Sequence, residues 1–195
     1  MQQDAVQQSM THGEVMIYRE PNDDEASSVA ALHALSWRSA YRGRLPDGYL
    51  DRDVLDDRAR VWTQRFGNRV GTLTVVASDP NGLVGFAHSI LDEDPEWGTL
   101  LDNLHVSPDH KRAGVGTRLV HESVRRIADR TSTAGIHLWV HEANASARAF
   151  YEHLGGSITG AGTSHDGGGS APIVRYAWAD LGDLRRRSAR ETSES

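Results

Sequence analysis

The chain has 195 residues, 38% of them hydrophobic, and its 27 acidic against 21 basic residues give a formal net charge of -6. The length suits one domain, and the acidic balance argues against a nucleic-acid partner, because proteins that bind nucleic acid are usually basic. The chain has no cysteine, no apolar run near the ~20 residues of a membrane-spanning helix and no signal-like stretch in residues 1–14, so we expect no thiol chemistry, no membrane partner and a cytoplasmic location.

The first half of the chain contains patterns typical of two helices and four strands. Residues 21–25 supply a turn, a cap and first-turn acids for a helix. Apolar residues spaced by three or four positions predict helices, short apolar runs predict strands, and the segment Asp-Pro-Asn-Gly at 79–82 predicts a hairpin. The elements expected here are a strand at 15–18, helices at 26–43 and 55–66, and strands at 72–77, 83–91 and 99–106.

The second half predicts two helices, at 115–127 and 144–154, and strands at 136–140 and 173–178. Residues 155–169 hold seven of the 19 glycines, which predicts a flexible loop or a hairpin tip. The order of elements, β-α-α-β-β-β-α-β-α-β-β with no repeat, predicts one α/β domain at 14–182 with a mixed, mostly antiparallel sheet. Residues 1–13 are expected to form a disordered tail, and residues 183–195 a charged tail.

Two histidines, His121 and His141, begin a His-Glu pair, which is the start of the zinc motif His-Glu-x-x-His. The last position of that motif holds Arg125 after the first pair and Ala145 after the second. The sequence therefore predicts no metal site.

The most informative segment for chemistry joins the strand at 99–106 to the helix at 115–127. The strand leads through Pro108 into a basic loop with Gly114 and Gly116. Glycines let the backbone approach a ligand closely, and the helix start adds the positive end of its dipole, so the segment suits a bound pyrophosphate. It is neither a P-loop nor the dinucleotide fingerprint, whose third glycine is replaced by Leu119. A glycine pair alone also fits a simple turn into a helix.

Three ordered segments of the sequence resemble the GCN5-related N-acetyltransferase (GNAT) family. Residues 111–116, Lys-Arg-Ala-Gly-Val-Gly, resemble the family's Arg/Gln-x-x-Gly-x-Gly/Ala loop, and residues 104–108 resemble the strand before it. Residues 144–155 resemble the late Asn-x-x-Ala-x-x-Phe-Tyr-x-x-x-Gly helix. The resemblance extends over the whole predicted domain. It implies a mostly antiparallel sheet flanked by about four helices, strands that splay apart at the cofactor site, and acetyl-CoA as co-substrate.

Two departures from the family pattern stand out. Lys111 occupies the usual Arg/Gln position, which keeps a charge but loses the rigid guanidinium fork. Gly156 stands where the family commonly has Phe, so we expect a core aromatic to be missing and the next strand to be looser.

The resemblance assigns roles to residues along these segments. Tyr151 is expected to be the general acid for the departing thiolate, although it also fits a core position. Asn144 fits a helix cap as well as a cofactor contact. The residues expected to bind acetyl-CoA are Leu104, His105, Val106, Lys111, Arg112, Ala113, Gly114, Val115, Gly116, Thr117, Asn144 and Tyr151.

The general base is left open by the sequence. Some family members carry a Glu five residues before the matched Asn144, and this position is Trp139 here, so that role does not carry over. The nearest titratable candidates are Asp102, His105 and Glu142, each of which also fits a structural or solvent-exposed role. Ordered water could replace a dedicated base.

The resemblance places the acceptor pocket near Trp37, Tyr41 and His165, although Trp37 also fits the core and the loop of His165 a plain connection. The predicted function is direct transfer of an acetyl group from acetyl-CoA to a primary amine of a small molecule or peptide, in a ternary complex. The alternative is a non-catalytic acyl-CoA-binding regulatory module. We expect a monomer or a homodimer.

Overall fold

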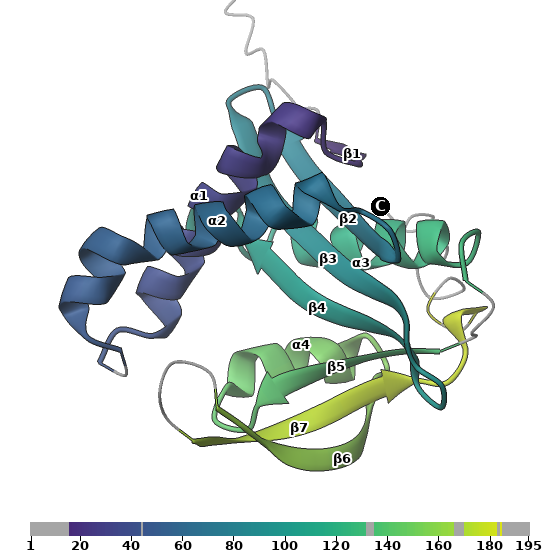
Figure 1. The fold of residues 1–195 in the computed structure, drawn as a ribbon. Helices are drawn as coiled ribbons and strands as arrows, with labels where there is room; N and C mark the ends of the chain where they lie inside the picture. Colours follow the sequence, from purple (N-terminus) through teal and green to yellow (C-terminus); the bar gives the residue numbers. More distant parts are fainter. Residues whose placement is uncertain (1–15, 44, 132–134, 166–169, 183, 185–195) are drawn as a thin grey trace, which may run out of the picture.

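The computed structural model describes residues 16–43, 45–131, 135–165, 170–182 and 184. One seven-stranded sheet organises this part of the chain, in the order β1-β2-β3-β4-β5-β7-β6 (Figure 1). The strands are Ile17–Arg19 (β1), Thr72–Asp79 (β2), Gly82–Asp94 (β3), Gly98–Val106 (β4), Ile136–His141 (β5), Ser157–Ser164 (β6) and Ala171–Trp178 (β7). The α-helices are Ala26–Ala40 (α1), Val54–Gly67 (α2), Val115–Ile127 (α3) and Ala145–His153 (α4).

Strand directions confirm the predicted mixed sheet. Five of the six neighbouring pairs are antiparallel, and β4 with β5 is the parallel one. The predicted order of helices and strands is also confirmed, with shifts of one to three residues at most element ends. The predicted tails lie outside the described ranges except for Leu184, which is buried in the larger core although it was assigned to the charged tail at 183–195. The domain limits stay predictions.

The glycine-rich segment was predicted to be a flexible loop or a hairpin tip, and its described part forms one strand of an antiparallel pair, which favours the hairpin over the loop. Residues Ser157–Ser164 form β6 and pair with β7 along their length. A ladder of backbone hydrogen bonds needs no side chains, and glycine leaves room for large neighbours. A Cβ on Gly160 would lie 3.3 Å from the guanidinium of Arg175, and one on Gly162 would lie 3.4 Å from the Trp139 ring. Residues 166–169 are outside the described ranges.

Helices cover the sheet in two layers. In Figure 1, α1 and α2 lie in front of β2, β3 and β4, while α3 and α4 lie behind the sheet. The front layer has its own core around Trp62 and Phe86, and the rear layer has the larger one. The rear layer confirms the predicted inner face of α3, whose buried apolar residues are Val115, Leu119, Val120, Val124 and Ile127. No described helix is long and apolar enough to cross a membrane.

The missing family aromatic at Gly156 is replaced by a residue from another strand. A Cβ on Gly156 would lie 2.7 Å from the indole of Trp178, which is buried and donates from Nε1 to the Leu154 carbonyl at 3.0 Å. The expected loss of a core aromatic is therefore wrong: β7 supplies the ring, and β6 still pairs with β7.

Strands β4 and β5 splay apart, as the resemblance implies. They pair only at Thr99–Ile136 and Leu100–His137, and then diverge toward their C-terminal ends (Figure 1). The register of β3 against β4 skips Asp102, so this residue forms a bulge where the divergence begins. Because a bulge bends and twists its strand, it turns the rest of β4 away from β5. Within the described ranges, the facing backbone edges of both strands have no strand partner beyond this point.

Candidate active site

The loop between β4 and α3 is shaped by two left-handed residues. Arg112 has φ 63° and Gly114 has φ 75°, a region that residues other than glycine rarely adopt. The helix starts at Val115 without a side-chain cap, and the first helical bond recorded at its start runs from the Arg118 N–H to the Gly114 carbonyl at 3.0 Å. The N–H groups of the first turn therefore remain available, at the positive end of the helix dipole. This geometry suits an anion.

Positive charge lies next to these N–H groups. Lys111 and Arg112 are exposed, and neither pairs with a carboxylate in the part of the chain described. Arg118, one turn into α3, is already paired with Glu122 at 3.2 Å. Two uncommitted cations therefore adjoin the helix start.

A hydrogen bond anchors this loop to a distant hairpin. His110 Nε2 lies 3.2 Å from Asp79 Oδ2, at the tip between β2 and β3. Burial would raise the pKa of Asp79, but the N–H groups of Asn81 and Gly82 hydrogen-bond its carboxylate and lower the pKa overall. The sequence indicated only a turn at 79–82, because nothing local connects it to residue 110.

Three of the predicted segments meet beside the splay. A Cβ on Gly116 would lie 3.5 Å from the Phe150 ring and 3.7 Å from the side chain of Val106. The end of β4, the start of α3 and the middle of α4 are therefore in contact. Leu104 and Val106 pack toward the rear core, whereas His105 points to α1.

Tyr151 lies among aromatic rings of α4 and β7. Its ring centroid is 5.2 Å from that of Phe150, 6.1 Å from Tyr176 and 6.2 Å from Trp178. Burial raises the pKa of the phenol, which keeps it protonated and able to donate a hydrogen bond. Asn144 caps α4, since its Oδ1 accepts the Ala147 N–H at 3.1 Å.

The three candidate bases differ in their hydrogen-bond or ion-pair partners and in their exposure to solvent. Arg65 of α2 pairs with Asp102 at 2.7 Å. His105 Nδ1 lies 2.7 Å from Ser36 Oγ, and burial lowers the pKa of His105 to about 4, even though Asp102 acts to raise it. Glu142 is exposed in the turn after β5. None of the three is both buried at the splay and free.

Aromatic residues connect α1 to the end of β5. The ring of Trp37 lies 4.8 Å from Tyr41, and Tyr41 lies 6.4 Å from His141. The guanidinium of Arg58 stacks 4.2 Å above Trp37. The structure thus brings Trp37 and Tyr41 together beside the splay, while His165 is exposed just after β6, with no recorded contact to either.

Two buried histidines, one in α1 and one in β3, lie in the front core, and the sequence pattern did not predict their burial. His33 Nε2 lies 2.9 Å from Trp37 Nε1, and His33 Nδ1 lies 3.0 Å from Trp62 Nε1. Both indole groups can only donate, so a neutral imidazole can accept from one of them and a protonated imidazole from neither. Burial, with the nearby charges, lowers the pKa of His33 to about 2, and burial lowers that of His88 to about 3.

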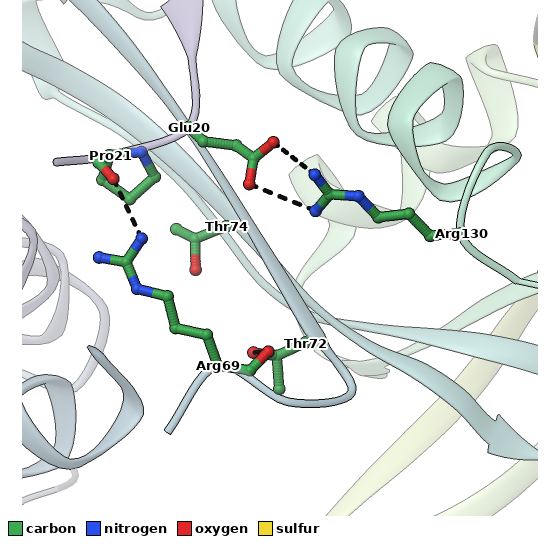
Figure 2. A pocket seen from close by; sticks show the side chains of 6 residues that line it. All are labelled: Glu20, Pro21, Arg69, Thr72, Thr74 and Arg130. Carbon is green, nitrogen blue, oxygen red and sulfur yellow. Dashed lines mark hydrogen bonds and ion pairs between the residues drawn. The ribbon is translucent and has the colours of Figure 1, made fainter. Parts of the chain in front are cut away.

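A polar hollow at the sheet edge does not fit a phosphate. Figure 2 shows its lining of Glu20, Pro21, Arg69, Thr72, Thr74 and Arg130. Arg130 makes two bonds to Glu20, at 2.7 and 3.3 Å, and Arg69 donates to the Pro21 carbonyl at 3.2 Å. Both cations are therefore engaged. Arg130 also follows the C-terminal end of α3, about 20 Å from the basic loop at its start.

Two curated relatives match the sequence. Over 93 residues the chain is 33% identical to mycothiol acetyltransferase of Saccharopolyspora erythraea, a match that covers 44% of this chain and 31% of that protein. Over 131 residues it is 27% identical to a "probable N-acetyltransferase" of Mycobacterium tuberculosis, covering 64% of this chain and 70% of the relative. The chain thus spans about a third of the first relative's length.

The fold is shared with solved acetyltransferase structures. The PaiA N-acetyltransferase of Thermoplasma acidophilum, solved with coenzyme A, superposes with a TM-score of 0.66 at 17% identity, over 84% of this chain and 99% of that one. Residues 36–156 match the model of the acetyltransferase (GNAT) family, a stretch that includes the basic loop, both arms of the splay and α4. The chain therefore belongs to the acetyltransferase (GNAT) family.

Proposed function

We propose that the protein is an acetyl-CoA-dependent N-acetyltransferase that acts on a primary amine of a small molecule or peptide by direct transfer. The observation that carries this proposal is the splay of β4 and β5 next to an uncapped helix start with two uncommitted cations. Family membership and the names of its relatives support the same reaction. A cytoplasmic location and a monomeric or dimeric state remain part of the proposal.

The co-substrate would use both features of the site. The N–H groups from Arg112 to Thr117, with Lys111, suit the pyrophosphate, because helix starts and left-handed turns bind anions. The amides of the pantetheine arm can satisfy the open edge of β4 near Leu104 and Val106, since unpaired backbone groups need a partner.

Direct transfer forms a C–N bond and breaks the C–S bond of the thioester. The acceptor arrives as an ammonium with a pKa of ~10 and must lose a proton before it attacks. The nitrogen loses a second proton as the amide forms, and the departing CoA thiolate gains one. Tyr151 would donate a hydrogen bond to that sulfur, and its raised pKa keeps the proton available.

Among the bases proposed from sequence, His105 lies on the β4 arm of the splay beside Ser36 of α1, yet it is a weak base. A pKa of about 4 keeps the ring neutral near pH 7, but it makes proton removal from an ammonium strongly unfavourable. His105 therefore suits orientation of Ser36 and of the β4 arm better than proton removal. Asp102 is held by Arg65, and Glu142 faces solvent.

The weakness of these bases favours a second candidate function, a non-catalytic acyl-CoA-binding module. One experiment separates the two. Thiol release from acetyl-CoA is measured with a polyamine, an aminoglycoside, an amino acid and peptides bearing a free N-terminus or a lysine, and acetyl-CoA binding is measured in parallel by thermal shift. Release with an amine supports the enzyme, binding without release supports the module, and absence of binding contradicts both.

A further inference from the structure

The end of β5 presents a histidine to the helix that also contacts β4. Leu138 and Val140 are buried in the rear core, so the alternate residues of β5 face the side of α1 and α2. His141 is on that side, because its ring meets the ring of Tyr41 at 84°. Ser36, on the same helix, contacts His105 of β4. The C-terminal half of α1 therefore spans both arms of the splay.

His141 has a polar atom with nothing to bind. Its Nδ1 is buried and has no hydrogen-bond partner in the described part of the chain. Buried polar atoms almost always have a partner in protein, water or ligand. The other buried candidates at the splay are engaged, His105 with Ser36 and Asp102 with Arg65. His137 also has buried nitrogens without a hydrogen bond, but it lies at the last paired position of β4 and β5. At the open end of the splay, His141 is the titratable group whose buried atom lacks a partner among the described residues.

The surroundings of His141 suit a cationic amine. Tyr41 at the end of α1 contacts His141, and Trp37 one turn earlier, with Arg58 stacked over its ring, adds a second aromatic ring. Aromatic faces attract ammonium groups, and they also exclude water from the place where the charge must be lost. Trp139, two residues before His141 on the same side of β5, is 40% exposed and extends this aromatic surface.

We propose that His141 is a catalytic residue that contacts the acceptor and takes the proton from its amine through Nδ1. This inference rests on the proposed function. The ammonium loses one proton to His141 and attacks the thioester carbonyl. When the C–S bond breaks, the second proton of the nitrogen replaces the one that Tyr151 gives to the thiolate. His141 then releases its proton to solvent, so the cycle ends with acetyl-amine, CoA thiol and one free proton.

Chemical rescue tests this assignment in the full chain. In His141→Ala, we expect kcat for the best amine of the panel to fall about 100-fold, a usual value for loss of a general base. Acetyl-CoA affinity should stay within about twofold, and added imidazole should restore a large part of kcat. His153→Ala, an exposed histidine at the end of α4, is the matched control and should leave kcat unchanged with or without imidazole.

The outcomes separate this inference from the proposed function. Unchanged kcat in His141→Ala overturns the role of His141 while the acetyltransferase stands. A loss that imidazole does not restore, with normal acetyl-CoA binding, assigns His141 to packing and also overturns the inference. If His141→Ala unfolds, His141→Asn keeps a polar group at the Nδ1 position, and it should bind acetyl-CoA normally with the same loss of kcat. A wild-type protein that binds acetyl-CoA but acetylates no amine contradicts the proposed function itself.

Discussion

The two faces of the sheet differ in the charge of the basic side chains that lie at the candidate site. Those on one face are exposed and charged, whereas the histidines on the other are buried and neutral. On the face of α3 and α4, Lys111 and Arg112 are exposed cations beside the start of a helix. On the face of α1 and α2, His33, His88 and His105 lie among aromatic rings, and their lowered pKa values keep them neutral. Solvent preserves charge on the first face, and burial removes it from the second. One face therefore suits an anionic cofactor, and the other suits a reaction in which an amine must lose its charge.

The largest expected effect is loss of stability in mild acid. The three histidines take up protons near pH 6.5 when unfolded, but only at about pH 4 or below when folded. The unfolded state therefore binds more protons below pH 6.5, and stability that is complete above this pH falls as the pH drops. At pH 5.5 each histidine contributes a loss of about 1.4 kcal/mol, roughly 4 kcal/mol in total. Urea unfolding at pH 7.5 and 5.5 measures this difference.

A substitution within the group sharpens the result. His88→Gln keeps a hydrogen-bonding group next to Thr74 but removes one titration, so about a third of the acid sensitivity should disappear. Equal stability of the wild-type protein at the two pH values would contradict neutral burial of these histidines.

The next effect concerns Tyr151 on the other face. Tyr151→Phe keeps the ring among Phe150, Tyr176 and Trp178 but removes the proton donor. We expect kcat to fall about 100-fold with little change in acetyl-CoA affinity, because the loss affects only the transition state. Tyr49→Phe, which removes a hydroxyl that donates to Asp57 of α2, is the control. Turnover that is equal in all three proteins would leave Tyr151 as a core residue.

A smaller effect is expected for the exposed cations. Replacing Lys111 and Arg112 together by Ala should weaken acetyl-CoA binding about 10-fold, or about 1.4 kcal/mol, at low salt. The difference should shrink at high salt, because these charges are solvent-exposed. Arg125→Ala on α3 removes an equally exposed charge that is paired with Glu122, and it serves as the control in calorimetric titrations. If the loss of acetyl-CoA affinity did not depend on salt, it would be caused by a change in the backbone of the loop and not by the two charges.

The smallest effect tests the anchor between the loop and the hairpin. Asp79→Asn weakens the contact with His110 while it keeps a hydrogen-bonding oxygen for the turn. We expect KM for acetyl-CoA to rise about threefold with kcat unchanged, since only the position of the loop is loosened. A fall in kcat at constant KM would show that the anchor acts on chemistry rather than on binding.

Much of the fold and part of the site were predictable because their signals are local. The inner face of α3 follows a spacing of three and four residues, and the glycine loop precedes it directly in sequence. The order of elements then predicted the mixed sheet and the resemblance predicted its splay, both of which the structure confirms. Asn144 was predicted to be a helix cap or a cofactor contact. The cap depends only on a residue three positions away, and the structure shows it as a hydrogen bond from the Ala147 N–H to Asn144 Oδ1.

Local patterns misled where a distant residue decides the environment. Gly156 looked like a defect, but Trp178 fills its space from 22 positions away in the chain. The glycines at 160 and 162 left a loop and a hairpin tip open, and pairing with β7 makes them part of a hairpin strand. In both cases a residue of β7 fills the space or supplies the hydrogen bonds. The composition of one segment is therefore a poor guide to its structure.

The sequence by itself predicted the glycine loop at 111–116 as a candidate cofactor site, and it indicated the family, because those features depend on neighbouring residues. Only the tertiary structure decided the roles available to titratable groups. It pairs Asp102 and His105 with residues of α2 and α1, and among the described residues it gives the buried Nδ1 of His141 no hydrogen-bond partner. Whether a side chain is charged, paired or free depends on its burial and on contacts between segments far apart in the chain, and no spacing rule contains that information.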